Sequence, residues 1–249
     1  MNDFVVIGLG ELGGVFAHGA LRTGHRVWPV RRADDPAAIA REVPNPALVA
    51  ITVGEDDLDG VLQALPASWH GAAMLVQNEL LPRAWSALRS EPTVAVVWFE
   101  KKKTTPITPI LPTPVAGPRA EVVLGAMRAL GIPCERVGDD ALVDALVAKN
   151  LYILTANLAG LAHGGTVGEL WEVHREHAEA VAREVLALQS ALLGRPVDVE
   201  ARLADLTRAI DADPKHGARG RTAPARLARA LRHADELGID VPTLRALPR

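Results

Sequence analysis

Residues 4–32 constrain the fold more than any other stretch of this chain. Residues 4–7 are an apolar run with three β-branched residues, which is typical of a buried parallel strand. They lead directly into a turn that fits the pattern Gly-x-Gly-x-x-Gly. An amphipathic helix is expected over 11–22 and a second strand over 25–30. The glycines therefore stand in a strand–turn–helix–strand context, which separates a dinucleotide-binding turn from a chance match.

Each glycine of this turn has a physical reason. Gly8 permits the tight turn, Gly10 lets the backbone approach a pyrophosphate, and Gly13 lets the helix pack closely on the strand. The free N–H groups and the positive dipole end of the helix then favour phosphates. The competing interpretation is a glycine-rich turn that binds no ligand. The residues predicted to bind the cofactor here are Gly8, Leu9, Gly10, Glu11, Leu12 and Gly13.

The end of the second strand predicts which nicotinamide cofactor binds. An NAD site usually places Asp or Glu there, to accept a hydrogen bond from the ribose 2′-hydroxyl. This chain has Arg31 and Arg32 instead, and its acids come only at Asp34 and Asp35. Because guanidinium groups suit a dianionic 2′-phosphate, the sequence favours NADP(H) over NAD(H). The alternative is that one or both arginines only solvate the loop.

Strands alternate with helices through the first half of the chain. This alternation predicts an α/β fold with a Rossmann-type, doubly wound parallel sheet. Five strands are expected at 4–7, 25–30, 47–53, 72–76 and 93–99, with helices at 11–22, 37–42, 55–65 and 80–88.

Residues 100–118 interrupt the alternation with a lysine-rich charge run followed by five prolines. We expect an extended passage in which 107–115 pairs antiparallel at the sheet edge. The three lysines are interpreted as a solvated hairpin, and attraction of an anionic substrate is the alternative. A helix over 121–130 and a short strand over 134–137 complete this half.

Strand signals vanish from Asp139 onward. Helices are expected at 139–162, 167–193, 199–210 and 224–237, the second opened by a Thr166–Glu169 capping box and the third by Asp198. The sequence thus predicts an NADP-binding Rossmann domain over 1–138 and an all-helical substrate and catalytic domain over 139–249. The active site is expected in the cleft between the two domains, beyond the carboxyl ends of the strands.

Composition excludes several classes of function. The net charge of −3 and the low aromatic content of 4% argue against a nucleic-acid partner. The chain has no secretory signal and no run of about 18 apolar residues, so no membrane span is expected. A single cysteine, Cys134, suits a reducing cytoplasm. No metal site is predicted, because His174 and His177 are interpreted as a solvated helix face. The apolar helices are compatible with a homodimer.

Lys149 stands out in the long helix because its neighbours are apolar. A lysine in such surroundings must find a partner or a wet cavity, and burial would lower its pKa enough to make it a usable acid. Asn157 follows eight residues later and falls near the same face, as does Asn150. The alternative is a lysine that reaches the helix surface, with asparagines that bond the helix ends.

These features together resemble the ketopantoate reductase family, within the group of 6-phosphogluconate-dehydrogenase-like enzymes. They are the glycine turn with Arg31 and Arg32, Gln77-Asn78 after the fourth strand, Lys149 with Asn157, and the closing run 238–242. The resemblance implies that Lys149 is the general acid and that Asn157 binds substrate. It also implies that Gln77 and Asn78 contact the cofactor, and that Asn78 bridges it to the substrate.

The chain departs from the family pattern on the substrate side. Ile153 stands where the family's helix usually has a middle asparagine, Val53 where a lysine is common, and Glu79 where a glycine follows Gln-Asn. The late serine and glutamate of the family are missing from 220–224. In their place we consider His216, Arg219 and Arg221 as residues that bind a carboxylate.

The resemblance implies an NADPH-dependent oxidoreductase that reduces a small 2-oxo acid, or a related carbonyl or imine compound, with Lys149 as general acid. One alternative is an NADP(H)-binding sensor or partner protein that has lost catalysis. Another is an opine- or imine-forming dehydrogenase acting on a different substrate.

Overall fold

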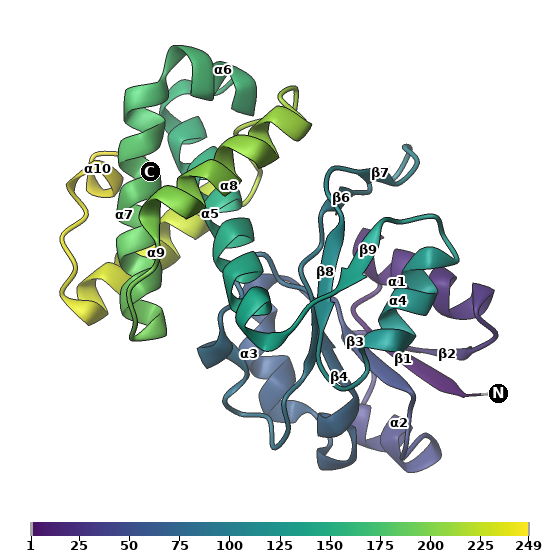
Figure 1. Ribbon diagram of the computed structural model, residues 1–249. Helices are drawn as coiled ribbons and strands as arrows, with labels where there is room; N and C mark the ends of the chain where they lie inside the picture. The colour runs from purple at the N-terminus through teal and green to yellow at the C-terminus, as the bar shows by residue number, and fades with distance from the viewer. Residues whose placement is uncertain (1, 249) are drawn as a thin grey trace. The chain divides into compact units, whose positions relative to one another are not determined.

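The computed structural model describes residues 2–248. The chain divides into two compact units, which we call unit 1 (up to Ala145) and unit 2 (from Leu146 on). The division falls inside helix α5 (Asp139–His163), whose first residue is the point at which strand signals end in the sequence. Figure 1 shows the elements of both units.

Unit 1 is built on one mostly parallel sheet, so the predicted Rossmann-type fold class is confirmed. Its strand order is β2-β1-β3-β4-β5-β8-β9. Among these described strands β5 and β8 are the one antiparallel pair, so β8 and β9 run opposite to the other five. The strands are β1 (Asp3–Ile7), β2 (Arg26–Val30), β3 (Leu48–Ile51), β4 (Ala73–Leu75), β5 (Thr93–Ala95), β8 (Thr113–Ala116) and β9 (Cys134–Arg136).

Helices cover both faces of this sheet. On one face α1 packs beside α4, and Phe4 and Val6 of β1 join Phe16 and Met127 of these helices in one core cluster. Val5 points to the opposite face and is equally buried, which explains why the strands are continuous apolar runs. The helical segments are α1 (Glu11–Arg22), α2 (Pro36–Glu42), α3 (Glu55–Ala64) and α4 (Ala120–Arg128), with short 3₁₀ turns η1 (Ala67–Ala72) and η2 (Pro82–Trp85).

Three predictions for unit 1 need correction. The expected strand 93–99 ends at Ala95, although the N–H of Val96 still donates to the carbonyl of Pro114 in β8. Phe99–Glu100 (β6) instead pairs with Thr108–Pro109 (β7) in a separate hairpin. The antiparallel pairing of the proline-rich segment is confirmed in β8, but β8 is not an edge, since β9 pairs on its other side. The expected helix 80–88 is only the 3₁₀ turn η2.

The regular secondary structure of the described residues of unit 2 is helical, apart from an isolated bridge between Thr166 and Gly217. The predicted capping box is present: Thr166 Oγ1 accepts from the N–H of Glu169, and the Glu169 carboxylate accepts from the N–H of Thr166. Asp198 also caps its helix as predicted. Besides the rest of α5, the helices are α6 (Val167–Val173), α7 (Arg175–Leu193), α8 (Val199–Ala212), α9 (Ala223–Leu237) and α10 (Pro242–Arg245).

The expected single helix over 167–193 is wrong, because the helix breaks at His174. Its backbone angles, φ −117° and ψ 31°, leave the helical region. The His174 ring stacks on His163 from the end of α5, with 3.8 Å between ring centroids. The break therefore coincides with a contact to a different helix.

Helix α5 is long and apolar enough to cross a membrane by length and composition. However, 78% of its most apolar window is buried inside the protein. Its apolar side chains are thus used for packing, as in the core helix of a folded domain.

Candidate functional site

The turn after β1 has the geometry that its glycines predict. Gly8 has φ +91°, a backbone conformation that favours glycine. A Cβ added to Gly13 would lie 2.0 Å from the carbonyl oxygen of Gly8, so no side chain fits there. Thr52, just after β3, fixes the turn from the other side, because its Oγ1 donates to the Gly8 oxygen at 2.6 Å. The close approach of turn, helix and strand therefore requires Gly8 and Gly13.

The N-terminus of α1 is open to a ligand. Gly10 is the N-cap residue, no side chain caps the helix, and a Cβ added to Gly10 would meet nothing within 4 Å. The turn lies where β1 and β3 end side by side, which is the point at which the strand order reverses. Backbone N–H groups at such a point are suited to phosphate. The residues present therefore fit the pyrophosphate of a dinucleotide.

Arg31 and Arg32 both lie at the end of β2, and each has an acidic partner. Arg31 donates to Asp34 through Nε and Nη2, both at 3.1 Å, while its backbone N–H donates to the same carboxylate at 2.8 Å. These bonds lower the pKa of Asp34. Arg32 donates to Asp57 of α3 at 2.8 Å. Both guanidinium groups are exposed, so a 2′-phosphate would compete with surface ion pairs, which are individually weak.

Gln77 and Asn78 lie at the same carboxyl edge of the sheet, after β4. The buried Gln77 amide donates to the carbonyls of Ile51 at 2.9 Å and Val53 at 3.2 Å. It therefore ties the ends of β3 and β4 together and supports the turn that follows. Asn78 is half-buried in this turn.

Lys101 is a residue of this edge that sequence reasoning missed. Its Nζ lies 3.7 Å from the carboxylate of Glu11 in the first turn of α1, and it donates to the carbonyls of Lys102 and of Thr105. The lysines were expected to be solvated, yet the Lys101 side chain is only 25% exposed. No local sequence signal marks this contact, since it depends on the β6–β7 hairpin.

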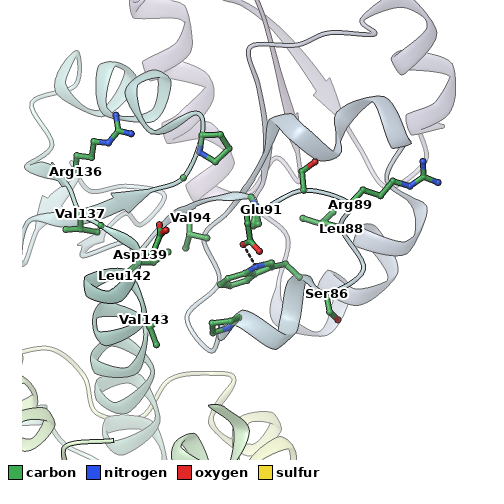
Figure 2. A pocket seen from close by; sticks show the side chains of 17 residues that line it. Ser86, Leu88, Arg89, Glu91, Val94, Arg136, Val137, Asp139, Leu142 and Val143 are labelled. Atoms are coloured by element: carbon green, nitrogen blue, oxygen red, sulfur yellow. Dashed lines mark hydrogen bonds between the residues drawn. The ribbon is translucent and has the colours of Figure 1, made fainter. Parts of the chain in front are cut away.

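A groove of about 1200 Å³ in unit 1 lies away from these residues (Figure 2). It is formed around the start of β5 and the end of β9, and Trp85 Nε1 donates to Glu91 within it. Because β5 is parallel to β1 and β3, its start lies at the sheet edge opposite the glycine turn. The groove contains none of the residues that the sequence predicts for the site.

In unit 2, Lys149 is buried as the apolar sequence around it predicts. Its side chain is 8% exposed, and its Nζ lies 5.7 Å from the centroid of the Tyr152 ring. Burial, and to a smaller extent the positive charge of Arg226, together lower the pKa of Lys149 to about 7. An amine with this pKa exchanges a proton readily near neutral pH.

The two asparagines of α5 differ in their surroundings. Asn150 Oδ1 accepts from Gln189 Nε2 at 2.8 Å, so this residue ties α5 to α7. Asn157 is buried against the loop before α9, where a Cβ added to Gly220 would lie 2.5 Å from Asn157 Oδ1. Unlike Asn150, Asn157 is therefore positioned by a close contact with a loop.

Arg226 is the second residue that sequence reasoning missed. It is 7% exposed, and its Nε donates to Thr222 Oγ1 at 3.1 Å. The sequence does contain a signal: Arg226 falls among Ala223, Leu227 and Ala230 on the apolar face of α9. The carboxylate ligands that we considered from the sequence are placed differently, since Arg219 and Arg221 are exposed and His216 lies 6.3 Å from the Tyr152 ring.

His163, His174 and His177 gather at the ends of their helices. His163 Nε2 lies 2.8 Å from His177 Nδ1, while its ring stacks on His174. Stacked rings bring their faces together rather than their nitrogen lone pairs. Across residues 2–248, no group of three His, Cys, Asp or Glu side chains is arranged to hold a metal ion.

The sequence matches no family model and no curated protein, whereas the structure matches many solved ones. A PanE/ApbA family ketopantoate reductase from Ralstonia eutropha aligns with a TM-score of 0.67 and 22% identity, over 98% of this chain and 95% of that one. A 2-dehydropantoate 2-reductase from Methylococcus capsulatus gives 0.66 and 16%, over 98% and 94%. A ternary structure of D-mandelate dehydrogenase with NADH and anilino(oxo)acetate gives 0.65 and 10%, over 98% and 95%. The chain therefore has the two-domain fold of ketopantoate reductases.

Proposed function

We propose that this protein is a nicotinamide-dependent oxidoreductase, and more narrowly an NADPH-dependent reductase of a small 2-oxo acid or a related carbonyl or imine compound. The observation that carries the proposal is Lys149, a buried amine whose pKa is lowered to about 7. It lies on the same helix as Asn157, as in the sequence pattern of ketopantoate reductases. The likeness of fold supports the same reaction class.

In this proposal the cofactor is held by unit 1. The N–H groups at the start of α1 bind the pyrophosphate, and Gly8 and Gly13 keep the turn in shape. Arg31 and Arg32, which pair here with Asp34 and Asp57, would bind the 2′-phosphate of NADP(H). A bound dihydronicotinamide supplies the hydride.

Lys149 then acts on the substrate as a general acid. Its ammonium form donates a proton to the oxygen of the carbonyl group as negative charge develops there. The buried position excludes water, which strengthens this interaction. Asn157 orients the substrate by hydrogen bonding, with its own position fixed by Gly220. Asn78 is proposed to contact both cofactor and substrate.

The proposal is tested by NADPH oxidation with a panel of 2-oxo acids, 2-oxo esters and imines. We expect turnover of at least one 2-oxo acid, with NADPH preferred over NADH. Tight NADPH binding without turnover on any member would contradict the proposal and favour a sensor. Turnover on imines alone would favour an opine- or imine-forming dehydrogenase.

A further inference from the structure

Lys101 brings a cation to the start of α1. It lies between β6 and β7 in their hairpin (Figure 1), and its Nζ is 3.7 Å from the carboxylate of Glu11. Glu11 is the first residue of α1 and directly follows Gly10, whose backbone is open to a ligand. The hairpin is therefore paired, through one ammonium group, with the first turn of the helix whose N–H groups we assign to a pyrophosphate.

The ammonium group of Lys101 is oriented by its own hairpin. Its side chain is 25% exposed, whereas that of Lys102 is 66% exposed and pairs with Glu100 in the same hairpin. Two of its three donor protons are used by the carbonyls of Lys102 and Thr105. The third remains for the side of Glu11, where 3.7 Å is too long for a hydrogen bond. One donor proton therefore remains for a closer acceptor at this end of α1.

Glu11 determines which charge is needed there. A carboxylate in the first turn of a helix is favoured by the helix dipole, and so is a phosphate. When both are present they repel each other, and a cation beside them lowers that cost. Lys101 is such a cation, because it already lies against Glu11.

We propose that Lys101 binds the pyrophosphate of the cofactor, so that the β6–β7 hairpin is a second part of the cofactor site. This inference rests on the proposed function and adds a side chain to a pyrophosphate site otherwise formed by backbone N–H groups. The proton on the side of Glu11 would go to a phosphate oxygen in a charge-assisted hydrogen bond. The bonds to the carbonyls of Lys102 and Thr105 would then tie the hairpin to the bound dinucleotide.

The first test is calorimetric titration of the full chain with NADPH, NADH and ADP-ribose, which share the pyrophosphate. Lys101→Met removes one charged hydrogen bond, so we expect the Kd of all three ligands to rise about tenfold. Lys103→Met, at an exposed lysine of the same hairpin, is the matched control and should bind all three like the wild type. A loss confined to NADPH would place Lys101 at the 2′-phosphate, and a loss that spares ADP-ribose would place it at the nicotinamide. Either result would overturn the inference.

A second substitution separates a direct contact from mere neutralisation of Glu11. Glu11→Gln keeps the backbone N–H groups and removes a like charge, so alone it should tighten binding about threefold. If Lys101 binds the pyrophosphate itself, Lys101→Met still costs at least about tenfold in the Glu11→Gln background. If the loss disappears in that background, the lysine only neutralises Glu11 and the inference is overturned.

Ionic strength distinguishes a charge contact from a disturbed hairpin. Lys101→Met also removes two hydrogen bonds within the hairpin, and their loss alone would weaken binding through a structural change. A partly exposed charge contact is screened by salt, so the difference between wild type and Lys101→Met should shrink to about twofold near 1 M salt. A difference that salt leaves unchanged would overturn the inference. Lys101→Arg keeps the cation and should bind within about threefold of the wild type.

The outcomes separate this inference from the proposed function. Dinucleotide binding that depends on Lys101, without turnover of any substrate, supports the inference while the reductase proposal fails. Turnover with an unchanged Kd for NADPH in Lys101→Met leaves the reductase standing and overturns the inference. Wild-type protein that binds none of the three ligands overturns both.

Discussion

The two units specify their functional residues in different ways. In unit 1 the candidate cofactor site is made of backbone, and the absence of side chains at Gly8 and Gly13 creates it. In unit 2 the candidate substrate site is made of buried polar side chains on apolar helices, namely those of Lys149, Asn157 and Arg226. The backbone site follows the sequence pattern of ketopantoate reductases, while the side-chain site departs from that pattern. The two kinds of site can therefore vary independently on one fold.

The largest expected effect comes from filling the backbone site. In Gly13→Ala the new Cβ meets the Gly8 oxygen at 2.0 Å, so helix and turn must separate. We expect a loss of about 3 kcal/mol in the free energy of unfolding and no measurable NADPH binding. Chemical denaturation and fluorescence titration measure the two quantities.

Gly14→Ala is the control for that substitution. Its Cβ meets nothing within 4 Å, and its position in the helix is exposed. Alanine there should stabilise the protein by about 0.5 kcal/mol. Equal stability and equal NADPH binding in Gly13→Ala and Gly14→Ala would show that close packing does not determine the geometry of this site.

Much of unit 1 could be predicted because its signals are local. The glycine turn, the bounds of α1 and the apolar strands depend on residues that are near in sequence. The break after Ala95 and the inner position of β8 could not be predicted, because they depend on pairing between distant segments. The break at His174 likewise involves His163 from another helix.

The second expected effect is the loss of folding stability that results from burying the amine of Lys149. Its pKa falls from 10.5 to about 7 on folding, so between those values the unfolded chain binds a proton that the folded chain lacks. Wild-type stability should therefore rise as the pH rises from about 7 to 10.5. Lys149→Met lacks this cost, so its advantage in stability over the wild type should be largest below pH 7 and should shrink by up to about 5 kcal/mol toward pH 10.5.

Denaturation at a series of pH values measures this difference. Lys215→Met, at an exposed lysine of unit 2, is the control and should keep the pH dependence of the wild type, because it retains Lys149. A gain from Lys149→Met that is constant with pH would argue against a buried amine that titrates.

A smaller effect is expected where a loop positions Asn157. The Cβ of Gly220→Ala would lie 2.5 Å from Asn157 Oδ1, so the amide must shift. We expect the KM for a 2-oxo acid to rise about tenfold while the Kd for NADPH is unchanged. Gly217→Ala, whose Cβ meets nothing within 4 Å, should leave both constants as they are.

The smallest effect is expected at the surface ion pairs of the cofactor site. Arg32→Ala should raise the Kd for NADPH about fivefold and leave that for NADH unchanged, because an exposed charge contributes little. Asp57→Ala removes the competing partner of Arg32 and should tighten NADPH binding slightly. Equal loss of both cofactors in Arg32→Ala would refute a role in selecting the 2′-phosphate.

The sequence indicated only part of the candidate substrate site. Lys149 and Asn157 could be selected from the sequence because polar residues are unusual in an otherwise apolar helix. Arg226 was missed although it falls on the apolar face of α9, since its burial depends on which helices pack against that face. The sequence predicted a solvated hairpin for the lysines, but the contact of Lys101 with Glu11 depends on packing between distant segments that it did not indicate.

The most direct test of the account compares NADPH binding with 2-oxo-acid reduction in wild type and Lys149→Met. We expect NADPH to bind equally well, because its proposed ligands are in unit 1. We expect kcat to fall by about 10²–10⁴-fold, the usual contribution of a general acid. The wild-type rate of reduction should also fall as the pH rises above about 7, where Lys149 loses its proton. Turnover that survives in Lys149→Met, with the same dependence on pH, would contradict Lys149 as the acid.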